Sequence, residues 1–183
     1  MSAVSARLDL GLRNNTLVAG LCLPVAALAL AAHLPHAFAL VAALMALVLV
    51  VVTATDLERR IIPNRLVLPA TAIVLCAQIA ISPARAGHWV VFSCAAAAFF
   101  LVPGLLNRSL VGMGDAKLAL LLGAGLGWGV VTALVLAFAA VFPVALFQVI
   151  RGGWQARNSS LPFGPFLAFG ALVVLIAPLL QAI

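Results

Sequence analysis

The sequence predicts an all-α membrane protein that crosses the bilayer several times. Of its 183 residues, 66% are hydrophobic and only 8% are charged, whereas soluble domains carry about 25% charged residues. The mean hydropathy is +1.29, and apolar runs long enough to cross the hydrocarbon core recur along the chain. These runs lack the alternation of apolar and polar residues that a membrane β-strand shows, so we expect helices and not a β-barrel.

About seven membrane segments are expected, of which the fifth is short. Residues 115–150 are too long for one crossing and too short for two, and four glycines between 123 and 129 offer a place to reverse direction. We therefore expect a fifth segment that does not cross the whole bilayer. The expected segments are residues 16–34, 37–56, 66–83, 89–106, 115–127, 129–150 and 164–182.

The segments are expected to form a single membrane-embedded domain over residues 1–183. Its core covers about residues 37–182, and residues 1–36 add an amino-terminal tail and an extra first helix. Arg7 and Arg13, followed by an apolar run and Ala29-Leu30-Ala31, also fit a cleaved signal peptide. The run is long for a signal peptide, so retention of the first helix is the preferred interpretation.

The basic residues predict the orientation. Nine of the ten fall in polar gaps before, between or after the expected segments that share one side of the membrane if successive segments cross it in opposite directions. Only Arg85 falls on the other side. Short cytoplasmic loops carry such an excess, so we expect the amino terminus inside and the carboxyl terminus outside. The net charge of +6 then reflects membrane topology and does not indicate nucleic-acid binding. The nine residues are Arg7, Arg13, Arg59, Arg60, Arg65, Arg108, Lys117, Arg151 and Arg157.

Metal, cofactor and hydroxyl-nucleophile chemistry have little support in the sequence. The three cysteines lie in separate apolar runs without a CxxC pair, and neither HExxH nor GxSxG occurs. The three histidines, His33, His36 and His88, are expected on the side opposite the predicted cytoplasmic face. Thr53, Thr55 and Gln78 fit hydrogen bonds between helices better than catalysis. We expect no metal and no cofactor.

Two carboxylates stand at the ends of apolar runs. Asp56 closes the second run, and Pro63 is expected to end that helix at Ile62. Asp115 follows Gly112 and Gly114 and is expected to open the next helix, where the glycines permit turns and close packing. Ionisable residues inside membrane segments are costly and usually functional. Both acids come out on the predicted cytoplasmic side.

If the two acids meet, they share a proton, because they cannot both ionise cheaply at close range. One then acts as general base on a water and the other as general acid. Helix dipoles favour the protonated form of Asp56 and the ionised form of Asp115, so Asp115 is the expected base. Three alternatives stay open: each acid pairs with a nearby Arg or Lys, the pair couples proton movement in a small transporter or channel component, or the chain is a structural subunit.

Three blocks carry a resemblance to a known family. Gly112-Met113-Gly114-Asp115 matches the GxGD motif of intramembrane aspartyl proteases. Asp56, followed by Ile62-Pro63-Asn64, resembles the first-aspartate motif of the type IV prepilin peptidases. The stretch from Leu161 to Ala168 is similar to a third block of that family. The resemblance covers about residues 40–170.

The resemblance implies a role for each block. Asp56 and Asp115 would be the catalytic acids, and the substrate would be the leader of a type IV prepilin or pseudopilin, cleaved at the cytoplasmic face of a bacterial inner membrane. Glu58 is a candidate contact for the basic leader, with an ion pair to a neighbouring Arg as the alternative. The chain has no CxxC pair, and in this it resembles the short form of the family without a methyltransferase domain, as in systems that process Flp-type pilins. The residues that would shape the site are Gly112, Gly114, Pro63, Asn64, Gly164 and Pro165.

Overall fold

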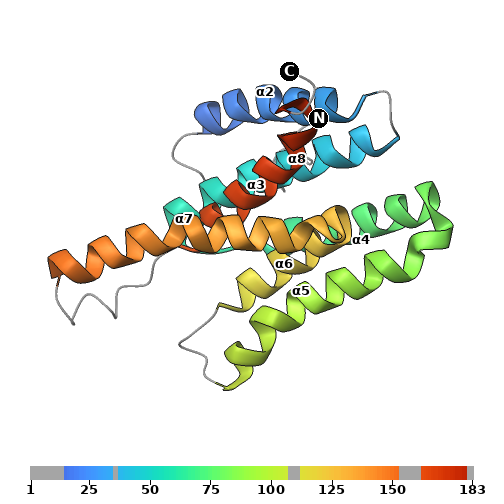
Figure 1. Ribbon diagram of the computed structural model, residues 1–183. Coiled ribbons are helices and arrows are strands. Elements are labelled where there is room, and N and C mark those ends of the chain that lie inside the picture. The colour runs from blue at the N-terminus through green and yellow to red at the C-terminus, as the bar shows by residue number, and fades with distance from the viewer. Residues whose placement is uncertain (1–14, 35–36, 107–111, 153–161, 181–183) are drawn as a thin grey trace.

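The computed structural model describes residues 15–34, 37–106, 112–152 and 162–180. Over these residues the chain forms seven α-helices and one short 3-10 helix, which confirms the all-α prediction (Figure 1). In order these are α2 (Asn15–His33), α3 (Phe38–Arg59), α4 (Asn64–Ile81), η1 (Pro83–Arg85), α5 (Ala86–Leu106), α6 (Met113–Leu126), α7 (Gly129–Gly152) and α8 (Gly164–Leu180).

Among the helical stretches that the structure describes, four are long and apolar enough to cross a membrane. They are Phe38–Arg59, Asn64–Ile81, Pro83–Leu105 and Gly129–Gln148, and shorter apolar stretches occur at Gly20–His33 and Gly164–Pro178. The helix α6 has 14 residues and is therefore about 21 Å long, well short of a hydrocarbon core of about 30 Å. The expected short fifth segment is α6, which lies between longer helices.

The predicted boundary near residue 127 is confirmed. The helix α6 ends at Leu126, and α7 begins at Gly129. Gly127 between them has a φ of +53°, and a Cβ there would come within 2.7 Å of His88. Only glycine combines that backbone conformation with such a close approach.

The predicted end of α3 at Ile62 is wrong by three residues. The helix ends at Arg59, because Arg60 adopts the left-handed conformation with φ 53° and ψ 38°. The N–H of Arg60 then donates to the carbonyl oxygen of Asp56 at 2.9 Å, and the chain turns toward α4. Pro63 caps α4, and its carbonyl accepts the N–H groups of Leu66 and Val67.

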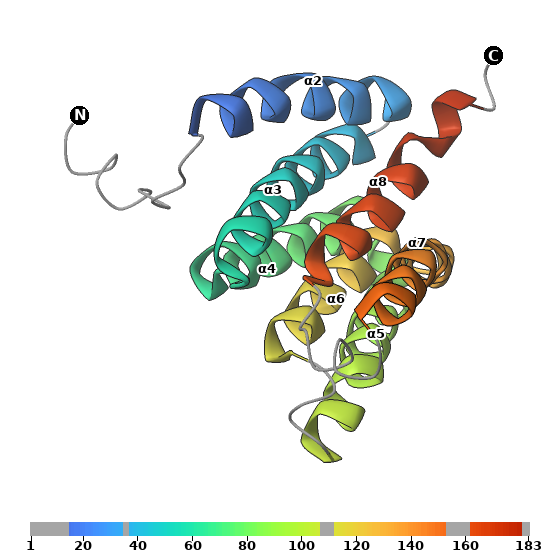
Figure 2. The ribbon, with the colours of Figure 1, turned by 90° about the vertical axis from the view of Figure 1, so that its left-hand side faces the viewer.

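The short helix α6 lies inside the bundle, as Figure 2 shows between α4, α5 and α8. Leu118, Leu121 and Leu122 are fully buried. A Cβ on Gly123 would clash with the Phe92 carbonyl of α5, so the two helix backbones pack closely at this glycine. The hydroxyl of Ser93 donates to the Leu120 carbonyl at 2.8 Å. Small residues and interhelical hydrogen bonds replace the hydrophobic driving force that lipid-embedded helices lack.

The polar residues predicted to bond between helices divide into two groups. Gln78 of α4 donates from Nε2 to the Gly125 carbonyl of α6 at 2.8 Å, fully buried, as expected. Thr53 and Thr55 do not link helices. Their hydroxyls donate to carbonyls of α3 itself, three or four residues earlier, which satisfies them without a neighbour.

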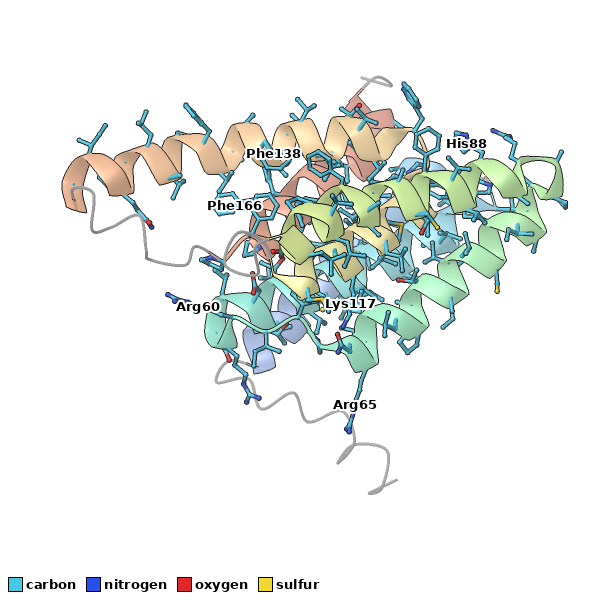
Figure 3. All side chains as sticks on the ribbon, turned by 90° about the horizontal axis from the view of Figure 1, so that it is seen from below. Arg60, Arg65, His88, Lys117, Phe138 and Phe166 are labelled. Carbon is cyan, nitrogen blue, oxygen red and sulfur yellow. The ribbon has the colours of Figure 1, made fainter. Side chains whose placement is uncertain are left out.

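The helices alternate in direction, so that the end of α3 and the starts of α4, α6 and α8 gather at one end of the bundle (Figure 1). We call this the acidic-pair end. His88 contacts the α6–α7 turn at the opposite end, and His33 bonds to the carbonyl of Leu175 late in α8 at 2.9 Å. Figure 3 shows His88 far from Arg60 and Arg65. His36 lies outside the described residues.

Candidate active site

Asp56 lies in the last turn of α3 and is 6% exposed. Its Oδ2 accepts the backbone N–H of Gly164 at 3.0 Å. Gly164 is the first residue of α8, and the N–H groups of a first helical turn have no partner within the helix. A carboxylate is a favourable acceptor at that position because the positive end of the helix dipole lies there. Two residues 108 positions apart in the sequence are thus joined at the acidic-pair end.

The absence of a side chain at Gly164 allows this bond. A Cβ at that position would lie 2.7 Å from Oδ2 and 3.1 Å from Cγ of Asp56, closer than van der Waals contact permits. Pro165 follows in the first turn of α8, where a missing N–H removes no helical hydrogen bond. The Gly164-Pro165 pair therefore suits a helix that starts against a buried carboxylate.

Asp115 lies in the first turn of α6 and is partly buried. Its pKa is raised to about 6, first by burial of the carboxyl group and then by the charge of Asp56, against a lowering by a backbone hydrogen bond at Gly112. The charge of Asp56 affects Asp115 only because the two acids lie close enough to interact electrostatically. Both predicted acids are therefore neighbours at one end of the bundle.

The glycines before Asp115 contact both acid-bearing segments. A Cβ on Gly112 would lie 3.3 Å from Oδ2 of Asp115. A Cβ on Gly114 would lie 3.1 Å from the Cβ of Ile62, in the turn after α3. Ile62 is only 9% exposed. Ile62 stood in the sequence only as part of the first-aspartate block and had no predicted role in the site. Its apolar side chain, directly before a proline and between basic residues, was the signal that could have marked it.

The remaining predicted site residues lie around the same end. Lys117 Nζ donates to Asn64 Oδ1 at 2.9 Å and so joins the starts of α6 and α4 on an exposed face. Pro63 precedes Asn64 as the α4 cap. Glu58 is exposed in the last turn of α3. Within the residues that the structure describes, no group of three or more His, Cys, Asp or Glu side chains is arranged to hold a metal ion.

An aromatic cluster adjoins the acidic pair, and sequence reasoning also missed it. Phe163 directly precedes Gly164, and its ring lies 5.8 Å from that of Phe100 on α5 and 5.4 Å from that of Phe138 on α7. Figure 3 labels Phe138 on α7. The cluster packs the start of α8 against α5 and α7. Each ring comes from a different apolar run, so only the packing of the helices reveals it.

Comparison with known proteins agrees with this arrangement. The model of the type IV leader peptidase family matches residues 43–150, a range that contains both acids but not Gly164. A protein of Burkholderia pseudomallei (strain K96243) called "Prepilin leader peptidase/N-methyltransferase" is 35% identical over 151 residues, which cover 76% of this chain and 45% of the relative. Proteins of the same name are 32% identical in Aeromonas salmonicida and 30% identical in Aeromonas hydrophila, each with 75% of this chain and 49% of the relative covered.

The chain spans about half the length of the curated relatives that it matches. No solved structure matches it significantly. The family model covers more than half of the chain, from within α3 to within α7. On this evidence the chain belongs to the type IV leader peptidase family.

Proposed function

We propose that this protein is an aspartic-type peptidase that removes the amino-terminal leader from a type IV prepilin or pseudopilin at the cytoplasmic face of the bacterial inner membrane. The observation that carries the proposal is the pairing of a buried Asp56, held by the Gly164 N–H at 3.0 Å, with an Asp115 whose carboxyl group interacts with it electrostatically. The family supplies the substrate class, and we propose residues 1–183 as one peptidase domain.

The chemistry follows from one proton shared between two carboxyl groups. Oδ2 of Asp56 accepts the Gly164 N–H, so the shared proton lies elsewhere in the pair. The hydrogen bond from Gly164 stabilises the ionised form of Asp56, and we therefore propose Asp115 as the proton carrier. This reverses the expectation from helix dipoles alone, which made Asp115 the base.

In this mechanism the Asp56 carboxylate takes a proton from a water molecule, and the water oxygen attacks the scissile carbonyl carbon. Asp115 gives its proton to the leaving amine as the C–N bond breaks. Each cycle consumes one water and returns the pair to its singly protonated state. No metal or cofactor takes part in these steps.

The substrate is proposed to approach along the bilayer and to present its leader at the acidic-pair end. Glu58 is exposed there and offers a negative charge to a basic leader. The orientation is supported by Arg59, Arg60, Arg65, Lys117 and Arg151, which lie at the ends of helices on this side, whereas Arg85 lies in η1 on the other. Such a bias is typical of a cytoplasmic face.

The test is co-expression of the chain with an epitope-tagged precursor, a Flp-type prepilin first and a pseudopilin second. We expect wild type to convert the precursor to a shorter band, and Asp56→Asn and Asp115→Asn to leave it intact at equal protein levels in the membrane. Asp9→Asn, outside the described residues, is the matched control and should cleave like wild type. Undiminished processing by either site variant would refute the mechanism. Proton flux across vesicles without any cleavage would favour a proton-coupled transporter.

A further inference from the structure

One apolar side chain in the turn between α3 and α4 is buried although its surroundings are exposed. Ile62 is 9% exposed, whereas its neighbour Ile61 is 61% exposed and Leu57 is also 61% exposed. The turn is otherwise basic, with Arg59 and Arg60 before Ile62 and Arg65 after it. The burial of Ile62 is therefore a specific contact of one side chain and not a general property of the turn.

The contact joins the two acid-bearing segments. Arg60 turns the chain back with its positive φ of 53°, and Ile62 comes to rest against Gly114, one residue before Asp115. A Cβ built on Gly114 would meet the Cβ, Cδ1 and Cγ1 atoms of Ile62 at 3.1, 3.3 and 3.3 Å. The segment that follows Asp56 in the chain is thus seated directly on the backbone that leads into Asp115.

We propose that Ile62 is a positioning residue, whose side chain, seated on Gly114, sets the separation of the Asp56 and Asp115 carboxyl groups. The inference rests on the proposed peptidase function and deepens it. Ile62 itself touches no reacting atom. Gly114 has the complementary role, since its lack of a Cβ lets the isoleucine approach this closely.

The alternative is that Ile62 merely fills space in the core. The two roles predict different kinetic responses. A residue that only fills space changes the stability of the protein and leaves the kcat of the folded protein unchanged. A residue that sets the separation of the acids changes kcat while KM stays constant, and its effect is coupled to that of its contact partner.

The first experiment is a double-mutant cycle with Gly114→Ala and Ile62→Ala, assayed for prepilin cleavage in nanodiscs. The methyl group of Gly114→Ala forces Ile62 back by a few tenths of an ångström, and a misplacement of about 1 Å can cost about a hundredfold in rate. We expect each single variant to lower kcat about fourfold, the loss that a shift of about 0.3 Å gives on that scale, with KM unchanged. The double variant is expected to lose less than the product of the two single losses, because Ile62→Ala removes Cγ1 and Cδ1, two of the three atoms that the new methyl group would meet.

A loss in the double variant equal to the product of the two single losses, as two independent effects would give, would overturn the proposal, and so would single variants that match wild type. Ile61→Ala is the matched control, since it removes an exposed isoleucine one residue away and should keep kcat within about twofold. If Ile62→Ala fails to accumulate in the membrane, Ile62→Val replaces it in the cycle and is expected to show a smaller loss with the same coupling.

A second readout does not need cleavage. The chain contains three aspartates, Asp9, Asp56 and Asp115, so carboxyl-13C aspartate labelling gives three signals to titrate. Because the charge of Asp56 contributes to the raised pKa of Asp115, a changed separation of the two acids in Ile62→Ala should shift the Asp115 midpoint, and Ile61→Ala should leave it unchanged. An identical midpoint in Ile62→Ala and wild type would refute the positioning role. Absence of cleavage by wild type, with the midpoint shift present, would refute only the peptidase function.

Discussion

The substitution Gly164→Ala, which adds one methyl group, tests whether the hydrogen bond between Gly164 and Asp56 matters for cleavage. In Gly164→Ala the new Cβ would lie 2.7 Å from Oδ2 of Asp56, whereas ordinary contacts begin at 3.4 Å. The carboxyl group must therefore move by about 0.7 Å. Its atoms are the far end of a side chain, so the fold can accommodate the shift, but the proposed catalytic geometry cannot. A misplacement of about 1 Å can cost about a hundredfold, so we expect kcat to fall by about 30-fold.

The assay is cleavage of a tagged prepilin by purified protein in nanodiscs, with kcat and KM measured separately and thermal stability recorded for each variant. Gly87→Ala is the matched control, because no atom lies within 4 Å of a Cβ at that position, and it should behave like wild type. Gly164→Ala is expected to keep its KM and its melting temperature. A Gly164→Ala variant with wild-type kcat would show that the position of Oδ2 does not matter, and the reasoning would fail.

Two further predictions concern stability. The pKa of Asp115 is about 6 in the folded protein and near 3.9 in the unfolded chain. The protonated carboxyl group therefore stabilises the fold at low pH, and this stabilisation is lost as the pH rises from about 4 to 6. Asp115→Asn should therefore raise the free energy of unfolding at pH 7.5 by on the order of 3 kcal/mol and hardly change it at pH 4. Thermal melts in detergent at the two pH values measure this, and an equal effect at both would contradict the prediction. Gln78→Leu should lower the free energy of unfolding by about 1 kcal/mol, because it removes a buried hydrogen bond between helices. Thr71→Val breaks a hydrogen bond within α4, to the Val67 carbonyl, and should lower it less in the same melts. The reverse order would be inconsistent with the packing of α4 on α6.

The helices were predictable from the sequence because the length and polarity of an apolar run are local properties. All seven expected segments correspond to helices, and the glycines around Gly127 marked the reversal between α6 and α7. The end of α3 was not predictable to the residue. It depends on Arg60, a non-glycine residue with positive φ, and nothing in its type indicates a conformation that most side chains avoid.

The two acids were also recognisable, because a carboxylate at the end of an apolar run is unusual for its environment. Their surroundings were not. The dipoles of α3 and α6 alone do not set the charge of Asp56, because the start of α8 donates a hydrogen bond to it. That bond, like the contact of Ile62 with Gly114, depends on how helices remote in sequence pack, and no local pattern encodes it. The third block around Gly164 indicated that the region matters without revealing what it contacts.

The central claim is that Asp56 and Asp115 interact as one proton-sharing pair. The most direct measurement is a titration of the aspartate carboxyl carbons in 13C-labelled wild type and in Asp56→Asn, with Asp9→Asn used to assign the remaining signal. The account predicts an Asp115 midpoint near pH 6 in wild type and a lower midpoint in Asp56→Asn, because the neighbouring charge is gone. An Asp115 midpoint that is the same with and without the Asp56 carboxylate would contradict it.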